Sequence, residues 1–127
     1  MYTVTVEDEF SAAHNLRNYK GKCEKLHGHN YRVCLTVSGE VLDGSGMLVD
    51  FTVLKAILKD VLSEFDHTYL NEVPSFDSAK GGINPTAENI AKYIYKKSEL
   101  RIEKSELRIE KITVWETEKN CATYNEK

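Results

Sequence analysis

Two kinds of side chain alternate along the stretch His27-Gly28-His29-Asn30-Tyr31-Arg32-Val33-Cys34-Leu35-Thr36-Val37-Ser38. An alternation of period two is typical of a half-buried strand, because successive side chains point to opposite faces of a sheet. His27 and His29 fall on the face that also carries the apolar residues Tyr31, Val33, Leu35 and Val37. We therefore predict a β-strand with two histidines at one end of its apolar face.

The N-terminal segment has the same period. Apolar residues alternate with polar ones from Tyr2 to Val6, and the parity continues through Phe10 to His14. A strand that keeps one register over this range carries His14 on its apolar side. A last strand is expected over residues 112–116, with Glu116 on the face of Ile112.

Two helices are expected between these strands. Apolar residues recur at spacings of three and four over residues 51–65, after Asp50 as a suitable N-cap. A second helix begins at Asn84-Pro85-Thr86, with Thr86 as its cap and Glu88 in its first turn. Residues 71–84 between the helices form a long loop, a kind of segment that is often functional.

A heptad is repeated without change near the end of the second helix. Lys-Ser-Glu-Leu-Arg-Ile-Glu occupies residues 97–103 and again residues 104–110. Seven residues are nearly two helical turns, whereas an odd number reverses the faces of a strand. We expect the first copy to lengthen the helix or bulge as a loop, and the second to lead into the last strand.

Size and composition indicate one folded domain over residues 1–127. The chain is 41% hydrophobic and 29% charged, with a formal net charge of -3. A net acidic charge argues against nucleic acid as a partner. The apolar runs are far shorter than the roughly 20 residues that cross a bilayer, so no membrane segment is expected.

Cysteine usage favours a cytoplasmic location. Cys23, Cys34 and Cys121 are odd in number, and the N-terminus lacks a signal-peptide pattern. Cys34 lies on the strand face opposite the histidines and is expected to be a core thiol. Cys23, among the cations Arg17, Lys20, Lys22 and Lys25, is either a loop thiol or a reactive thiolate.

The histidines are the strongest candidates for chemistry. Residues two apart on a strand lie about 7 Å apart on one face, so two imidazoles can reach one metal ion. The alternative is a pair of ordinary strand histidines. With His14 added, three imidazoles resemble an open catalytic Zn²⁺ site with a position free for substrate.

Further candidates lie outside the strand pair. Asp66-His67 follows the first helix, and a carboxylate beside an imidazole suits an acid–base relay. Glu116 on an apolar face needs a partner, either a basic side chain or a ligand with two N–H donors. The basic residues at 17–25 are either a solvated loop or a site for a polyanion such as a triphosphate.

Together these residues resemble the 6-pyruvoyl-tetrahydropterin synthase family, and most closely its 6-carboxy-tetrahydropterin synthase branch. The resemblance covers nearly the whole chain. It rests on Phe10-Ser11-Ala12-Ala13-His14, Cys23-Glu24-Lys25-Leu26-His27-Gly28-His29-Asn30-Tyr31, Met47-Leu48-Val49-Asp50-Phe51, Asp66-His67-Thr68-Tyr69-Leu70-Asn71, Asn84-Pro85-Thr86-Ala87-Glu88-Asn89 and Val114-Trp115-Glu116-Thr117.

The resemblance implies an α+β tunnelling fold, a four-stranded antiparallel sheet with two helices on one face. It also implies trimers that close their sheets into a barrel and stack as a homohexamer. The implied zinc ligands are His14, His27 and His29. The implied catalytic groups are Cys23, Asp66 and His67, and the pterin would contact Glu116, Thr86 and Glu88.

The implied reaction acts on 7,8-dihydroneopterin triphosphate. The spacing Cys-x-x-x-His-Gly-His is similar to that of the carboxy branch, which feeds queuosine synthesis. Glu24 is similar to a residue of a branch that cleaves the side chain to 6-hydroxymethyl-dihydropterin, so Glu24 is a further catalytic candidate. The alternatives are that cleavage, the 6-pyruvoyl-type reaction, a metal-dependent hydrolase of another type, and a non-catalytic metal- or pterin-binding module on the same fold.

Overall fold

The structure is a computed structural model that describes residues 1–19, 21 and 24–126. The strands are β1 (Tyr2–His14), β2 (His27–Gly39), β3 (Thr68–Tyr69), β4 (Arg108–Trp115) and β5 (Cys121–Tyr124). The helices are α1 (Phe51–Leu62) and α2 (Ala87–Glu99), with 3-10 turns η2 (Leu70–Glu72) and η3 (Ser78–Lys80) in the loop between them. Among the described residues, no helix has both the length and the apolar character needed to span a membrane.

The five strands form one sheet in the order β3-β1-β2-β4-β5. β1 and β2 pair antiparallel along their whole lengths, which sets His14 directly opposite His27 and Ala12 opposite His29. The expected count of four strands is therefore corrected to five within the part of the chain that the structure describes. The two-residue strand β3 pairs in parallel with Ala12 and Ala13, and β5 folds back on β4 as a hairpin.

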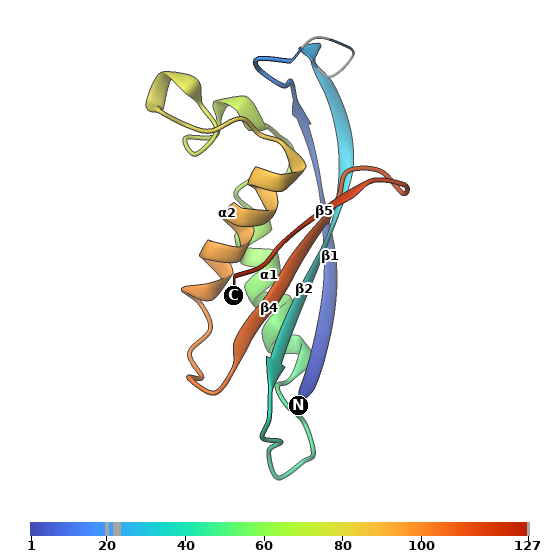
Figure 1. Cartoon of the computed structure of the whole chain (residues 1–127), viewed down its shortest axis with the longest axis vertical. Helices are drawn as coiled ribbons and strands as arrows, with labels where there is room; N and C mark the ends of the chain where they lie inside the picture. Colours follow the sequence, from blue (N-terminus) through green and yellow to red (C-terminus); the bar gives the residue numbers. More distant parts are fainter. Residues whose placement is uncertain (20, 22–23, 127) are drawn as a thin grey trace.

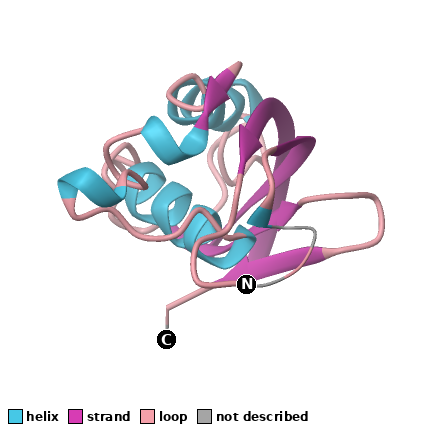
Figure 2. Ribbon diagram, turned by 90° about the horizontal axis from the view of Figure 1, so that it is seen from above, coloured by secondary structure: helices cyan, strands magenta, loops and turns pink. Residues whose placement is uncertain are grey.

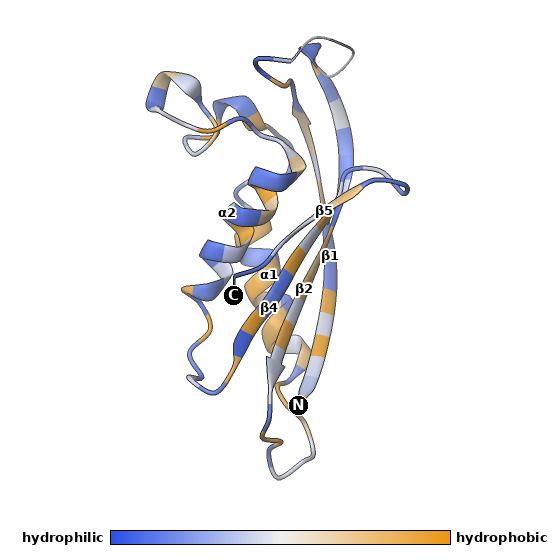
Figure 3. Cartoon of the chain, in the orientation of Figure 1, coloured by the Kyte–Doolittle hydropathy of each residue, from blue (hydrophilic) through white to orange (hydrophobic). Residues whose placement is uncertain are grey.

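Both helices lie on one face of the sheet, as expected for this α+β arrangement (Figures 1 and 2). Hydrophobic and hydrophilic positions alternate along β1 and β4 (Figure 3). Because the apolar face points toward the helices, it joins their apolar stripes in one core. This core includes Phe10, Tyr31, Leu58 and Ile94, each at most 1% exposed.

Both expected helix caps form. The Asp50 carboxylate accepts a hydrogen bond from Thr52 N at 2.8 Å, and Thr86 Oγ1 accepts one from Asn89 N at 3.1 Å. Each bond satisfies a donor that the first turn of a helix leaves without a partner, a contribution of about 1 kcal/mol. The cap at Thr86 also fixes where α2 begins, next to a cavity that Glu116, the residue after β4, also lines.

The two heptad copies adopt different conformations, in line with the expectation from their odd length. Residues 97–99 of the first copy finish α2, residues 100–107 form the connection, and residues 108–110 of the second copy open β4. Arg101 of the first copy donates a hydrogen bond to Lys97 O and another to Asp60 on α1. In the second copy Ile109 is 4% exposed in the core, and its carbonyl accepts a bond from Tyr95.

Candidate metal centre and adjoining cavity

The three predicted histidines lie together at the paired ends of β1 and β2. One nitrogen from each of His14, His27 and His29 lies within 4.8 Å of the other two, which is close enough for one ion. The Nε2 atoms of His14 and His27 are 3.1 Å apart. The antiparallel register produces this convergence, because it sets the end of one apolar face against the start of the other.

The other ring nitrogens fix two of the tautomers. His14 Nδ1 donates a hydrogen bond to Pro85 O at 2.8 Å, and His27 Nδ1 donates one to Lys25 O at 2.7 Å. Because a carbonyl only accepts, each neutral ring carries its proton on Nδ1 and presents a lone pair on Nε2. Two lone pairs facing one another at 3.1 Å repel, and a shared cation removes that repulsion.

His29 supplies the observation that fits this site to a metal. Its Nε2 is buried and has no hydrogen-bond partner among the described residues. Buried polar atoms normally have a hydrogen-bond partner. An imidazole nitrogen that lacks one and lies beside two other imidazoles is suited to bind a metal ion. The three rings therefore form a donor set that could hold one metal ion and leave a coordination position open.

Burial disfavours the charged form of two of these rings. Desolvation lowers the pKa of His14, which is completely buried, and also lowers the pKa of His29. Tyr31 packs under the cluster with its hydroxyl oxygen 3.1 Å from His14 Nδ1, and burial raises the pKa of that hydroxyl. Since metal ions bind neutral imidazole, the lowered pKa values of His14 and His29 favour the form of these two rings that can bind a metal ion.

Glu116 lies between the histidines and a neighbouring cavity. Its carboxylate oxygens are 3.6 Å from His29 Nε2 and 3.9 Å from His14 Nε2. The cavity is about 310 Å³ in volume and is bounded by the first residues of α2 and by the β4–β5 hairpin. Its walls include Leu16, Thr86, Glu88, Glu116, Asn120 and Cys121.

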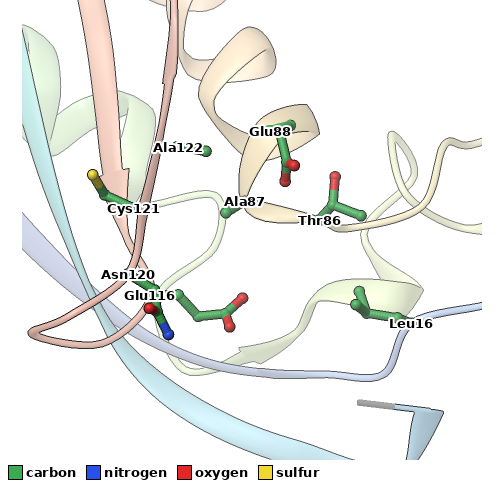
Figure 4. Close-up of a pocket in the computed structure, with 8 residues that line it drawn as sticks. All are labelled: Leu16, Thr86, Ala87, Glu88, Glu116, Asn120, Cys121 and Ala122. Carbon is green, nitrogen blue, oxygen red and sulfur yellow. The ribbon is translucent and has the colours of Figure 1, made fainter. Parts of the chain in front are cut away.

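Figure 4 shows the carboxylates of Glu88 and Glu116 directed toward the space between α2 and the hairpin. Thr86, Glu88 and Glu116, the three residues that the family resemblance assigns to pterin contact, thus line one cavity. Two carboxylates at one cavity suit a ligand rich in N–H donors. The close approach of Glu116 to the histidines brings any such ligand next to the metal centre.

The Asp66–His67 pair is formed. Asp66 Oδ2 is 3.0 Å from His67 Nδ1, and Asp66 Oδ1 accepts a hydrogen bond from Ser11 N at 2.9 Å. The bond from Ser11, followed by the interaction with His67, lowers the pKa of Asp66. His67 has a left-handed φ of 60° and an 83% exposed side chain, so the pair faces outward at the edge of the sheet.

The loop between β1 and β2 holds the remaining candidates. Cys23, Lys20 and Lys22 lie outside the described residues. Glu24 and Lys25, which precede the first residue of β2, are exposed. The guanidinium of Arg17 donates hydrogen bonds to Phe76 O and Gly82 O, so it supports the neighbouring loop instead of standing free for a phosphate.

Sequence reasoning missed several contributors and misplaced one cysteine. Pro85 O and Tyr31 contact His14, and Leu16 lines the cavity. Tyr31 shares the strand face of His27 and His29, which was its only signal, and nothing in the spacing of the sequence connects Pro85 or Leu16 with the site. Cys34 is only partly buried and lies on the sheet face away from the helices, within 3.9 Å of Arg32, so the expectation of a core thiol is wrong. Its parity was read correctly, but no second layer formed by the described residues covers that face of the sheet (Figures 1 and 2).

Fold and site together define an α+β protein with three histidines that could hold a metal ion, beside a carboxylate-lined cavity. The chain matches the 6-pyruvoyl tetrahydropterin synthase family over residues 3–127, and it belongs to that family. Relatives of this family are named as synthases, which supports an enzyme.

Two relatives and one solved structure illustrate the similarity. The 6-carboxy-5,6,7,8-tetrahydropterin synthase of Synechocystis is 36% identical over 129 residues, 98% of this chain and 93% of that protein. The enzyme of the same name from Bacillus subtilis is 45% identical over 86 residues, 67% of this chain and 57% of that protein. The structure of Caenorhabditis elegans 6-pyruvoyl tetrahydropterin synthase matches with a TM-score of 0.82 and 34% identity, over 100% of this chain and 98% of that one.

Proposed function

We propose that this chain is a zinc-dependent 6-carboxy-5,6,7,8-tetrahydropterin synthase that acts on 7,8-dihydroneopterin triphosphate. The observation that carries the proposal is the convergence of three imidazole nitrogens within 4.8 Å, next to a cavity that contains Glu116. Several relatives at 32–45% identity bear the name of this activity, which supports the carboxy branch of the family.

His14, His27 and His29 would hold the zinc ion through their Nε2 atoms. A bound zinc ion supplies Lewis acidity that polarises a substrate oxygen and favours loss of a neighbouring proton. The carbonyls of Pro85 and Lys25 keep two of the ligand rings in the required tautomer. The chain itself therefore contributes a ligand set in which His14 is buried, His27 and His29 are half-buried, and two rings are oriented by main-chain carbonyls.

Glu116 is the proposed anchor for the pterin ring. A carboxylate can accept two parallel N–H bonds from the amidine edge of a pterin, and this fork fixes both position and orientation. Thr86 and Glu88 line the opposite wall, at the start of α2. Since Glu116 also lies within 3.9 Å of two histidine nitrogens, the side chain of an anchored pterin has only a short distance to the metal centre.

Cys23, Asp66 and His67 are the proposed proton-transfer groups. A thiolate at Cys23 would act as general base, as the family resemblance implies, and His67 with Asp66 would relay the proton. The hydrogen bond from Ser11 holds Asp66 as a carboxylate, and Asp66 in turn orients the His67 ring at 3.0 Å. Because His67 is exposed at an edge of the sheet, it is accessible to a neighbouring subunit.

A homohexamer of stacked trimers in the cytoplasm is part of the same proposal. Among the described residues, β1 pairs on its second side only through Ala12 and Ala13, and β5 has a neighbour only in β4. Open sheet edges of this kind favour pairing between copies, which closes the sheets into a barrel. The product would supply the synthesis of queuosine and related deazapurines.

The direct test is mass spectrometry of the products formed from dihydroneopterin triphosphate by the zinc-loaded protein. We expect 6-carboxytetrahydropterin as the main product, and no turnover by a His29→Ala variant. A main product of 6-pyruvoyl-tetrahydropterin would reassign the chain to the other branch of the family. Absence of turnover by a zinc-loaded, folded protein would favour the non-catalytic binding module.

Cleavage of the side chain to 6-hydroxymethyl-dihydropterin is the second candidate, because Glu24 stands directly beside Cys23 in the sequence. Glu24 is exposed and therefore available to a substrate. Under this proposal Cys23→Ala abolishes the carboxy product, whereas Glu24→Ala removes only the cleavage product. Equal loss of both products in both variants would contradict the division of labour.

A further inference from the structure

The chain that leaves β1 after His14 is held by two asparagine side chains from the α1–α2 loop. Asn71 Oδ1 accepts a hydrogen bond from Asn15 N at 3.0 Å, and Asn71 Nδ2 donates one to Asn15 O at 2.9 Å. Asn84 makes the same pair of bonds with Arg17, at 3.0 Å to its N and 2.9 Å to its O. Each carboxamide thus pairs with the main chain as the peptide of a neighbouring strand would.

These two bond pairs continue one edge of the sheet. β3 pairs with Ala12 and Ala13 along that edge, and the asparagine amides then take over at residues 15 and 17. Residues two apart in an extended chain direct their N–H and C=O groups to the same side. Residues 15–17 are therefore fixed as a side-chain-paired extension of β1, although they belong to no strand.

The extension has consequences on both sides of the site. At one end it follows His14, whose Nδ1 bonds to the carbonyl of Pro85, the residue after Asn84. In its middle is Leu16, whose side chain lies at the wall of the Glu116 cavity (Figure 4). The segment 84–86 therefore contacts Arg17, directly after Leu16, and the His14 ring, and it also caps α2 through Thr86.

Asn84 is itself well anchored. Its carbonyl accepts hydrogen bonds from Thr86 N at 2.8 Å and from Asn89 Nδ2 at 2.9 Å. The guanidinium of Arg17 adds bonds to Phe76 O and Gly82 O, so the loop and the extension hold one another from both sides. A support with this many bonds has a single geometry, which is the property that a preorganised ligand set needs.

We propose that Asn84 and Asn71 are positioning residues that aim His14 at the metal and Leu16 at the substrate cavity. This inference rests on the proposed function, since it assigns a role within the same site. Partners that orient metal ligands typically change metal affinity by about 10- to 100-fold when they are altered. The proposal therefore predicts a loss of zinc affinity from residues that do not touch the metal.

The test is a zinc competition titration of the zinc-free full-length protein against a chromophoric chelator. Asn84→Asp keeps the acceptor for Arg17 N but sets a carboxylate oxygen against Arg17 O, and we expect its zinc affinity to fall about tenfold or more. Asn71→Asp repeats the change at residue 15 and is expected to act in the same direction. If Asn84→Asp fails to fold, Asn71→Asp alone decides the question.

Two controls separate positioning from charge and from general destabilisation. Asn30→Asp adds the same charge next to His29 in the sequence. It keeps the hydrogen bond from Ser11 Oγ, because the oxygen Oδ1 of residue 30 already accepts that bond at 2.6 Å. Ile102→Ala weakens the fold far from the histidines. We expect both controls to bind zinc within about twofold of the unaltered protein.

The outcomes distinguish this inference from the proposed function. Zinc affinity within twofold of the unaltered protein in both asparagine variants, or an equal loss in Ile102→Ala, would overturn the positioning role. Retained zinc binding by the unaltered protein without any pterin product would overturn the proposed function and leave the positioning role intact. A higher KM for dihydroneopterin triphosphate in Asn84→Asp would support the second half of the proposal, that Asn84 also positions Leu16 at the substrate cavity.

Discussion

The heptad repeat allows one side chain to be tested in two structures with the local sequence held constant. Ile102 and Ile109 both stand within Leu-Arg-Ile-Glu-Lys, at residues 100–104 and 107–111. Ile109 is 4% exposed, lies opposite Val37 in the sheet and belongs to the core. Ile102 is partly buried in the connection and packs against the edge of that core.

The expected cost of truncation follows from this burial. Replacing a buried isoleucine by alanine costs about 2–5 kcal/mol, because apolar contacts are lost and a cavity remains. We expect about 3 kcal/mol for Ile109→Ala and about 1 kcal/mol for Ile102→Ala, where less surface is buried. The difference of about 2 kcal/mol corresponds to roughly a 30-fold difference in the unfolding equilibrium constant.

The assay is urea denaturation followed by circular dichroism, at one protein concentration and without added metal. These conditions are held fixed because assembly and zinc binding both shift apparent stability. Leu100→Ala, in a side chain that is 79% exposed, is the control and should change the free energy of unfolding by less than about 0.5 kcal/mol. Equal costs for the two isoleucines, or a larger cost for Ile102, would refute the assignment of the second copy to β4.

Three further predictions concern α2, pH and the cavity. The Ser98 side chain is completely buried and its Oγ has no hydrogen-bond partner among the described residues, so Ser98→Ala should raise the free energy of unfolding by about 1 kcal/mol. Ser105→Ala, at the exposed equivalent position, should leave the free energy of unfolding unchanged in the same urea assay. The folded state depresses the pKa of His14 and of His29 below 6.5, so as the pH falls the unfolded chain binds protons before the folded chain does. The zinc-free protein should therefore lose stability below about pH 6.5. A free energy of unfolding that stays constant from pH 7.5 to 5 would contradict this. Glu116→Gln should raise KM for dihydroneopterin triphosphate about tenfold in steady-state kinetics, because the amide keeps one neutral acceptor and sets its own NH2 group against the second N–H donor of the pterin. An unchanged KM would remove Glu116 as the pterin anchor.

The sequence was sufficient where local patterns and global contacts agree. The alternation through His14 and from His27 predicted two strands with histidines on their apolar faces, and the caps at Asp50 and Thr86 form as expected. Strand parity places residues on a face whatever the rest of the fold does. The candidate metal centre could therefore be found from spacing alone.

Other contributors had no local signal. β3 is only two residues long, and the bonds from Asn71 and Asn84 join positions 56 and 67 residues apart in the chain. The carbonyl that orients His14 belongs to Pro85, 71 residues away. Main-chain groups are present at every residue, so the sequence does not reveal which of them a distant side chain will meet.

The heptad separates the two kinds of information most clearly. The sequence by itself determined the strand parity, the helix caps and the three histidines, because each depends on the order of neighbouring residues. It could not decide the conformation of Lys-Ser-Glu-Leu-Arg-Ile-Glu, since the same seven residues end a helix in one copy and begin a strand in the other. Only tertiary contacts differ: Arg101 meets Asp60 on α1, whereas Ile109 enters the core opposite Val37, and those contacts outweigh propensities that are identical in both copies.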